Sequence, residues 1–203
     1  MSLSVLESLN RHFLKPETKA PPFYPLPEFP KTLSLDGIPV AEYISPEKLD
    51  RNLRFLSQKV RLKDYAAVVV NLSGGWPLYL RLVRLQNFIP TTHTVEYHRS
   101  KNGYSADVVV PIPGFLAGEK ILIVEDVYDT GGTLKAMFEH APHADAVVVV
   151  RKIGIPNQIP VPRVKAAVIT QNAWLGGMGM NFGAGFPRNF PRNYPGIVTK
   201  VSL

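Results

Sequence analysis

The sequence of 203 residues contains no cysteine. This absence excludes disulfide bonds, thiolate nucleophiles and cysteine-ligated zinc, and it fits a reducing cytoplasm. The chain also lacks any run near the ~20 apolar residues that a transmembrane helix requires. Its first residues, MSLSVLESLNRHFLK, have neither the apolar segment nor the small-residue cleavage site of a signal peptide. We therefore expect a cytoplasmic protein without a membrane partner.

Acidic residues are missing from the last quarter of the chain. All 16 of them lie between Glu7 and Asp145, whereas seven lysines and arginines follow position 150. Sixteen basic residues precede that point, so the net charge of +7 belongs to the last quarter. Such a region attracts polyanions, either a diphosphorylated substrate or nucleic acid. On charge alone, a solvated basic face is an equally good interpretation.

Apolar, β-branched runs alternate with helical patterns along the chain. A helix is expected after Ser45, which is a suitable N-cap, another after the SGGW turn at 73–76, and a third from about Gly132 to His140. This alternation predicts an α/β fold with a doubly wound, mainly parallel sheet flanked by helices. Ligands of such sheets bind beyond the carboxyl ends of the strands. The expected strands are YAAVVVNL (65–72), HTVEYHR (93–99), KILIVEDV (120–127), ADAVVVVRK (144–152) and VKAAVIT (164–170).

The stretch ILIVEDVYDTGGT, residues 121–133, carries the most chemistry. Four apolar residues run into the only adjacent pair of acids in the chain, Glu125 and Asp126, and Asp129 follows three positions later. Carboxylates suit a divalent cation or a proton transfer. The Thr-Gly-Gly-Thr turn would open a helix, whose free N–H groups and partial positive charge favour a phosphate. The stretch matches neither the Walker motif nor G-x-G-x-x-G, so we expect a different phosphate cradle.

This stretch closely resembles the phosphoribosyl-pyrophosphate motif of type I phosphoribosyltransferases over thirteen consecutive positions. The resemblance implies that Glu125 and Asp126 bind the ribose hydroxyls and the associated magnesium (Mg2+). It also implies that Asp129 is the acid/base that faces N7 of a purine. The 5′-phosphate would be held by the backbone and hydroxyls of Thr130, Gly131, Gly132 and Thr133.

Two further stretches resemble the 6-oxopurine branch of that family, whose members act on hypoxanthine, guanine or xanthine. NLSGGWPL (71–78) is similar to the family's L-K-G-G loop, with a serine in place of the usual lysine. The backbone of this loop binds pyrophosphate, which implies that role for Ser73, Gly74 and Gly75. VVVVRKIGIP (147–156) resembles the strand whose final lysine contacts the purine 6-oxo group, and this likeness points to Lys152.

The C-terminal part of the chain contains two more similar stretches. In AWLGGMGMNF (173–182), Trp174 falls on the aromatic residue that stacks on the base. Asn181 falls on an aspartate that helps to hold metal, and an asparagine supplies no carboxylate for a second magnesium ion. PRNYPGI (191–197) resembles a segment whose arginine contacts pyrophosphate. Arg192 is therefore the expected residue, with Arg188 of the nearby PRNF as the alternative.

Together these likenesses imply a phosphoribosyltransferase domain over residues 36–203, after a partly proline-rich extension over residues 1–35. A small hood built from N- and C-terminal segments would cover the base, with the C-terminal part contributing to it. The implied activity is purine salvage, in which phosphoribose passes from phosphoribosyl pyrophosphate to a 6-oxopurine base in a magnesium-dependent reaction. The resemblance further implies a homo-oligomer, either a dimer or a tetramer.

Two alternatives stay open. One is a phosphoribosyl-pyrophosphate-sensing regulator that has the same fold and binds nucleic acid, which the basic last quarter favours. Against it, 35 proline-rich residues leave too little room for a helix-turn-helix module, so we expect no nucleic-acid partner. The other alternative is a related transferase for a pyrimidine or another acceptor, against which Lys152 and Trp174 argue. The preference among purine bases is not fixed, because TQNAWLGG also resembles the xanthine-guanine enzymes.

Overall fold

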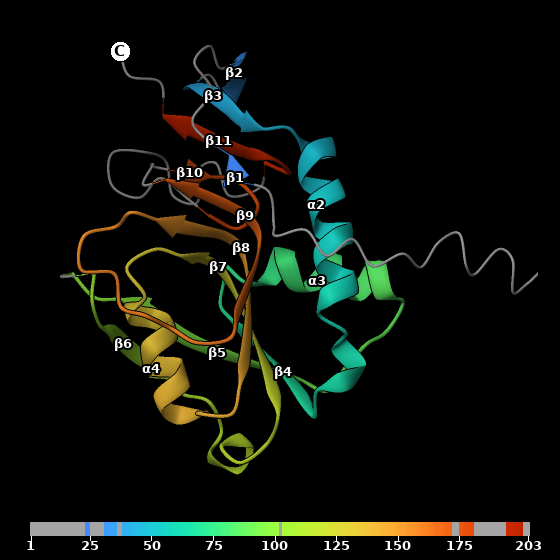
Figure 1. Ribbon diagram of the computed structural model, residues 1–203, viewed down its shortest axis with the longest axis vertical. Coiled ribbons are helices and arrows are strands. Elements are labelled where there is room, and N and C mark those ends of the chain that lie inside the picture. The colour runs from blue at the N-terminus through green and yellow to red at the C-terminus, as the bar shows by residue number, and fades with distance from the viewer. Residues whose placement is uncertain are drawn as a thin grey trace, which may run out of the picture.

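The computed structural model describes residues 23–24, 31–35, 38–101, 103–171, 175–180 and 194–200. Within this part of the chain, seven strands form one sheet in the order β1-β9-β8-β7-β4-β5-β6 (Figure 1). Neighbouring strands are parallel, except that β6 runs antiparallel to β5. The strands are Phe23–Tyr24 (β1), Ala67–Asn71 (β4), Thr92–Arg99 (β5), Ala106–Val110 (β6), Ile121–Tyr128 (β7), Asp145–Ile153 (β8) and Val164–Gln171 (β9).

The central strands are apolar because helices cover both faces of the sheet. All five residues of β4 and the first five of β7 are buried. Continuous apolar runs of this kind are typical of parallel strands that are buried on two sides. The five strands expected from the sequence are confirmed as β4, β5, β7, β8 and β9.

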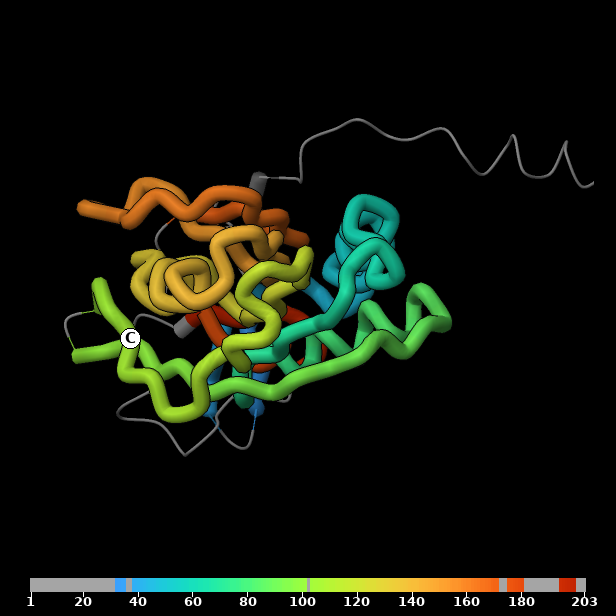
Figure 2. Tube along the Cα trace, turned by 90° about the horizontal axis from the view of Figure 1, so that it is seen from below, coloured from blue at the N-terminus to red at the C-terminus, as the bar shows by residue number. Residues whose placement is uncertain are grey.

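Three helices flank the sheet, two on one face and one on the other (Figures 1 and 2). Helix α2 (Pro46–Lys59) begins where Ser45 Oγ accepts a hydrogen bond from the Lys48 N–H, and it packs beside α3 (Trp76–Gln86). Helix α4 (Gly132–His140) buries Leu134, Met137 and Phe138 against the opposite face. Two short 3-10 helices, Leu62–Asp64 (η1) and Gly114–Leu116 (η2), connect elements. Among the described residues, no helix has the length and apolar character needed to cross a membrane.

A second, four-stranded antiparallel sheet forms a hood over one end of the main sheet (Figure 1). Its order is β10-β11-β3-β2, so segments from the two ends of the chain lie side by side in it. The hood is joined to the main sheet by a hydrogen bond between the hydroxyls of Tyr43 and Thr170, both buried. The predicted fold class is confirmed, including the hood. Its strands are Lys31–Leu35 (β2), Ile38–Ile44 (β3), Leu175–Gly176 (β10) and Ile197–Lys200 (β11).

Strand β6 is a main-sheet strand that the sequence patterns do not predict. After β5 the backbone N–H of Ser100 donates a hydrogen bond to the Ser105 carbonyl, and the chain then returns along β5 as a further strand. Val108, Val109 and Val110 are exposed, so β6 has no buried side to give it an alternating pattern. The predicted domain boundary after residue 35 stays a prediction.

Candidate active site

A cavity of about 420 Å³ opens at the carboxyl ends of β4, β5, β7 and β8. Parallel strands place their carboxyl ends at one edge of the sheet, where side chains from distant parts of the sequence meet. Leu175 and Met180, from the hood side of the chain, complete the lining. The residues around it are Asn71, Leu72, Ser73, Gly74, Tyr97, His98, Arg99, Glu125, Asp126, Val127, Tyr128, Asp129, Thr130, Gly131, Gly132, Thr133, Leu134, Lys152, Leu175 and Met180.

The Thr-Gly-Gly-Thr turn connects β7 to α4 and lines the cavity as expected. Gly131 is the N-cap and has φ 93°, a left-handed conformation that favours glycine. A Cβ atom on Gly132 would lie 2.6 Å from the Ser105 nitrogen, so only glycine lets the two segments approach this closely. The start of α4 therefore presents backbone N–H groups and a partial positive charge to an anion.

The hydroxyl of Thr130 is engaged with the turn between β5 and β6. It donates a hydrogen bond to the carbonyl oxygen of Gly103, and Thr130 is buried. Thr133 lines the cavity and is partly exposed. In this arrangement the backbone of the turn and the Thr133 hydroxyl are the groups that face an anion, while Thr130 fixes the neighbouring turn in place.

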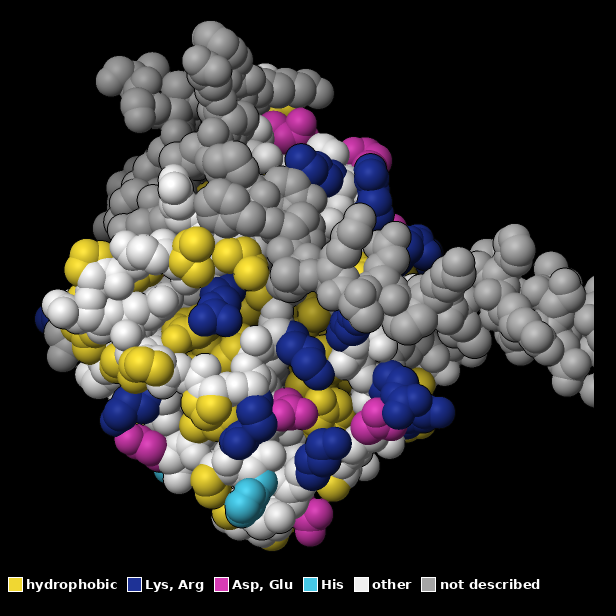
Figure 3. Space-filling model, in the orientation of Figure 1, with side chains coloured by type: hydrophobic (Ala, Val, Ile, Leu, Met, Phe, Trp, Pro, Cys, Tyr) yellow, Lys and Arg dark blue, Asp and Glu magenta, His cyan; other side chains and the backbone are white. Residues whose placement is uncertain are grey.

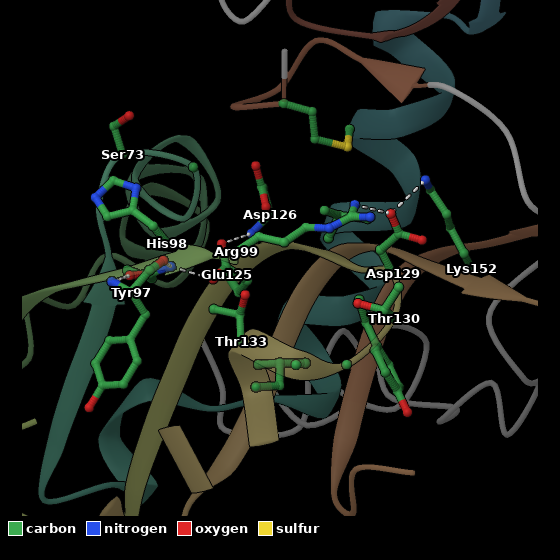
Figure 4. A pocket seen from close by; sticks show the side chains of 18 of the residues that line it. Ser73, Tyr97, His98, Arg99, Glu125, Asp126, Asp129, Thr130, Thr133 and Lys152 are labelled. Atoms are coloured by element: carbon green, nitrogen blue, oxygen red, sulfur yellow. Dashed lines mark hydrogen bonds and ion pairs between the residues drawn. The ribbon is translucent and has the colours of Figure 1, made fainter. Parts of the chain in front are cut away.

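Glu125 and Asp126 differ in their surroundings although they are adjacent in sequence. Glu125 is 5% exposed, and its two carboxylate oxygens accept hydrogen bonds from the Asn71 side-chain amide at 2.5 Å and from the Asp126 N–H at 2.9 Å. Burial raises the pKa of the Glu125 carboxyl well above its usual range, and the charge of Asp126 raises it further. The side chain of Asp126 reaches into the cavity beside Gly74 (Figure 4).

Asn71 is a site residue that the sequence motifs do not reveal. Its side-chain oxygen accepts the Tyr97 N–H at 2.8 Å, and its amide donates to the Tyr97 carbonyl at 3.0 Å as well as to Glu125. It thus links β5 to β7 across the end of β4, beside the register shift between Glu96 and Tyr97. A polar residue at the end of an apolar strand was the available signal. Tyr97 itself is buried within β5, and the turn toward β6 begins after Arg99.

Two cationic side chains, Arg99 and Lys152, approach the same carboxylate oxygen of Asp129. Its Oδ2 accepts a hydrogen bond from Arg99 Nη1 at 2.9 Å and lies 3.2 Å from Lys152 Nζ (Figure 4). Lys152 is buried near the end of β8, where the sequence places it. The predicted pair of Asp129 and Lys152 is therefore brought together. Arg99, at the end of β5, is not part of any motif and was missed.

A segment after β8 holds the backbones of Asp129 and Lys152 through hydrogen bonds. The side-chain amide of Gln158 donates to the carbonyl oxygens of Asp129 at 2.5 Å and Lys152 at 2.9 Å. The Ile159 N–H donates to the Thr130 carbonyl at 2.8 Å, and the Tyr128 hydroxyl donates to the Ile159 carbonyl at 2.7 Å. Gln158 lies in a proline-rich turn with no local pattern, so its role depends on tertiary contacts that the sequence does not display.

The loop after β4 places Ser73 and Gly74 at the cavity and Gly75 behind them. The Leu72–Ser73 peptide bond is cis. The Gly75 N–H donates to the Asn71 carbonyl at 3.0 Å, and a Cβ atom at Gly75 would lie 2.9 Å from the Val124 carbonyl carbon. Gly75 therefore packs the loop onto β7, whereas Ser73 and Gly74 are among the residues that line the cavity.

Three predicted site residues, Trp174, Asn181 and Arg192, lie outside the described residues, as does the alternative Arg188. Their roles stay predictions.

The described part of the cavity suits a magnesium ion that shares its coordination with a bound anion better than one held by protein side chains alone. Among the described residues, no group of three or more histidine, aspartate or glutamate side chains could hold a metal ion. Mg2+ commonly binds through one or two carboxylates together with substrate oxygens. Asp126 is the residue placed to supply such a carboxylate. Glu125 is less suitable, because it is buried and its oxygens face the Asn71 amide and the Asp126 N–H.

No protein-family model matches the chain, and no curated protein matches it in sequence. Solved structures match it in fold. A hypoxanthine phosphoribosyltransferase from Staphylococcus aureus superposes with a TM-score of 0.64 at 18% identity, over 79% of this chain and 90% of that one.

Two further structures agree with this result. The hypoxanthine phosphoribosyltransferase from Trypanosoma cruzi, in complex with the product IMP, has a TM-score of 0.66 at 16% identity over 86% of this chain and 96% of its own. A hypoxanthine-guanine phosphoribosyltransferase from Bacillus anthracis has a TM-score of 0.61 at 20% identity over 79% and 97%. The chain therefore has the type I phosphoribosyltransferase fold, in the form seen in hypoxanthine phosphoribosyltransferases.

Proposed function

We propose that the protein is a purine salvage enzyme, a magnesium-dependent 6-oxopurine phosphoribosyltransferase. It transfers phosphoribose from phosphoribosyl pyrophosphate to hypoxanthine, guanine or xanthine, and it releases the nucleoside monophosphate and pyrophosphate. The proposal rests on one observation: the Asp129–Lys152 ion pair and the glycine turn at the start of α4 line the same cavity. The pair offers one acceptor and one donor, which suits the N7–H and 6-oxo edge of such a base.

The residues of the cavity divide the reaction between them. The backbone N–H groups at the start of α4 hold the 5′-phosphate. Lys152 donates a hydrogen bond to the 6-oxo oxygen, which holds the base in line with C1 of the ribose. As the bond from C1 to pyrophosphate loosens and a bond from C1 to the base nitrogen forms, Asp129 accepts the proton at N7. The hydrogen bonds from Gln158 keep the Asp129 and Lys152 backbones in this relation.

Asp126 would hold magnesium together with oxygens of the substrate. When bound, the ion supplies positive charge that stabilises the departing pyrophosphate. Arg192 and Trp174 would add a pyrophosphate contact and a stacking surface for the base, as the sequence resemblance implies. The oligomeric state, a dimer or a tetramer by the same resemblance, belongs to this proposal as well.

The surface gives more support to the enzyme than to the nucleic-acid-binding regulator. On the described part of the face in Figure 3, lysine and arginine side chains stand among apolar and acidic groups. A nucleic-acid surface needs a spread of cations along one stripe. The cations that converge on one point, Arg99 and Lys152 at Asp129, suit a small anionic substrate instead.

The direct test is an assay for nucleotide formation. The purified protein is incubated with phosphoribosyl pyrophosphate, Mg2+ and one base at a time from hypoxanthine, guanine, xanthine, adenine and a pyrimidine, and the products are separated by chromatography. We expect nucleotide from at least one 6-oxopurine. The Asp129→Asn variant, purified identically, controls for a contaminating host enzyme. Absence of product from every base, together with tight and sequence-selective RNA binding, would favour the regulator.

A further inference from the structure

Arg99 is the second of two cations at the Asp129 carboxylate. Asp129 carries one negative charge, yet Arg99 and Lys152 both approach its Oδ2 atom, at 2.9 and 3.2 Å. Without Arg99, the Asp129–Lys152 pair would still be neutral as a unit. The arginine is therefore not needed to balance the charge of Asp129, and its presence leaves the cluster of Asp129, Lys152 and Arg99 with a net positive charge.

Of the two cations, Arg99 is the one that can leave. The Lys152 side chain is 9% exposed, so an unpaired charge there would be costly. The Arg99 side chain is 54% exposed and keeps access to water in other rotamers. It crosses the cavity from β5 to reach Asp129 (Figure 4). Its guanidinium also packs on Gly103, where an added Cβ atom would lie 2.8 Å from Nη2.

The loop that faces this cavity from β4 offers no cation of its own. Ser73 and Gly74 line the cavity beside Asp126, and neither side chain carries a charge. Among the described lining residues, the charged donors are Arg99 and Lys152, apart from His98 when it is protonated. The Nε2 atom of His98 lies 2.6 Å from Oε1 of Glu96. Arg99 is thus the available cation with both the reach and the freedom to meet a diphosphate in this cavity.

We propose that Arg99 has two successive partners: the Asp129 carboxylate, as in this structure, and the diphosphate of the bound phosphoribosyl donor. This inference rests on the proposed function. In its contact with Asp129, Arg99 occupies the carboxylate oxygen that a base would need. When the donor binds, the guanidinium moves to the diphosphate with a bidentate contact and exposes Asp129 to the base. Arg99 is then a binding residue for the donor and a positioning residue for Asp129.

Arg99→Gln separates these two effects because it removes the charge and keeps much of the side-chain length. Affinity for the phosphoribosyl donor should fall by roughly tenfold to a hundredfold, the scale of a lost charge-assisted hydrogen bond. Affinity for the base in the absence of the donor should rise, because one competitor for Asp129 Oδ2 is gone. A purely structural role would weaken both. Arg99→Lys should restore part of the donor affinity, since it restores the charge without the bidentate geometry.

The experiment measures the KM of the phosphoribosyl donor, and the Kd of the base without the donor by calorimetry, for the wild type, Arg99→Gln, Arg99→Lys and Lys101→Gln. Lys101 lies in the same turn and is exposed, so its variant removes an equal charge without touching Asp129. Thermal unfolding of each variant shows whether the fold is kept. A rise in the KM of the donor in Arg99→Gln alone, with a tighter base complex, supports the inference. Equal KM values in Arg99→Gln and Lys101→Gln, or parallel losses for both substrates, overturn it.

A second measurement keeps this inference distinct from the proposed function. Binding of inorganic pyrophosphate with Mg2+ is followed by calorimetry for the wild type and Arg99→Gln, without any base or turnover. Weaker binding in Arg99→Gln supports the anion contact even if no base yields nucleotide, in which case only the proposed function fails. If the wild type forms nucleotide but pyrophosphate binds both proteins equally, the proposed function stands and the role of Arg99 is wrong.

Discussion

At the scale of single residues, Glu125 has the most perturbed environment. It is buried beside Asp126, and the pKa of its carboxyl is raised mainly by burial. The folded protein therefore binds this proton more tightly than the unfolded chain does. The corresponding stabilisation is fully present below the unfolded pKa of about 4.3 and is lost as pH rises through the folded pKa.

Glu125→Gln is expected to remove this pH dependence. The amide resembles the protonated acid, and its carbonyl oxygen can still accept from Asn71 or from the Asp126 N–H. The Tm of the variant relative to the wild type should therefore rise between pH 5 and pH 8, as measured by thermal unfolding. Glu119→Gln, at an exposed position, should show the same Tm difference at both pH values. A Glu125→Gln difference that is flat or falls with pH would contradict the assignment.

Asp129→Asn is expected to lower kcat by about a hundredfold or more, the usual scale of acid–base assistance. It should also lower Tm, because the buried Lys152 loses its carboxylate partner. Asp145→Asn is the matched control, since Asp145 pairs with Arg163 at the other end of β8. That variant should lose stability while its kcat is kept. Steady-state kinetics and unfolding of both variants decide the matter, and a near-normal kcat in Asp129→Asn would remove Asp129 from the mechanism.

At the scale of elements, the loop between β4 and α3 contains two adjacent glycines, Gly74 and Gly75. Substitution of the first should affect activity, and substitution of the second should affect stability. A Cβ atom at Gly74 would meet the Asp126 carboxylate, with Cγ at 2.6 Å, and that side chain can move aside. A Cβ atom at Gly75 would meet the Val124 backbone, which cannot move without distorting β7. The two positions therefore respond differently to the same added methyl group.

We expect Gly74→Ala to keep its Tm within a few degrees and to lose activity through displacement of Asp126. Gly75→Ala should unfold at clearly lower temperature, with a loss of roughly 1–3 kcal/mol, as for other overpacked sites. Gly114→Ala, where nothing lies within 4 Å of the added atom, is the control for both. Equal Tm losses at positions 74 and 75 would show that Asp126 is rigidly held.

An element could be predicted from the sequence when neighbouring residues determine it, and it was missed when contacts with distant residues determine it. Helix α4 begins and ends where the sequence indicates, because the Thr-Gly-Gly-Thr turn fixes its start. Strand β6 was missed, since its valines are exposed and its pairing depends on β5. Residues in the site follow the same rule. Asp129 and Lys152 stand in motifs, whereas Arg99 reaches a carboxylate 30 positions away and Asn71 one 54 positions away.

At the scale of the whole molecule, magnesium should matter for turnover and not for folding. The described residues contain no cluster that could hold the ion without substrate. A chelator is therefore expected to abolish nucleotide formation and to leave the Tm of the substrate-free protein unchanged. Activity assays and thermal unfolding with and without EDTA, followed by restoration with excess Mg2+, check this. A lower Tm in the chelator would reveal a structural metal site.

The hood also sets an order of events during synthesis. Strand β3 pairs with β11, so Val40 and Lys200 are partners that emerge from the ribosome 160 residues apart. The main-sheet strands from β4 to β9 are complete before either β10 or β11 exists. Closing so long a loop is slow and costs chain entropy. The main sheet with the turn at the start of α4 should therefore form first, and the hood should form last. Pulse-labelling hydrogen exchange during refolding should protect β4, β7 and β8 before β3 and β11. Until β11 is made, the nascent chain would carry the turn at the start of α4 without the hood that covers the cavity.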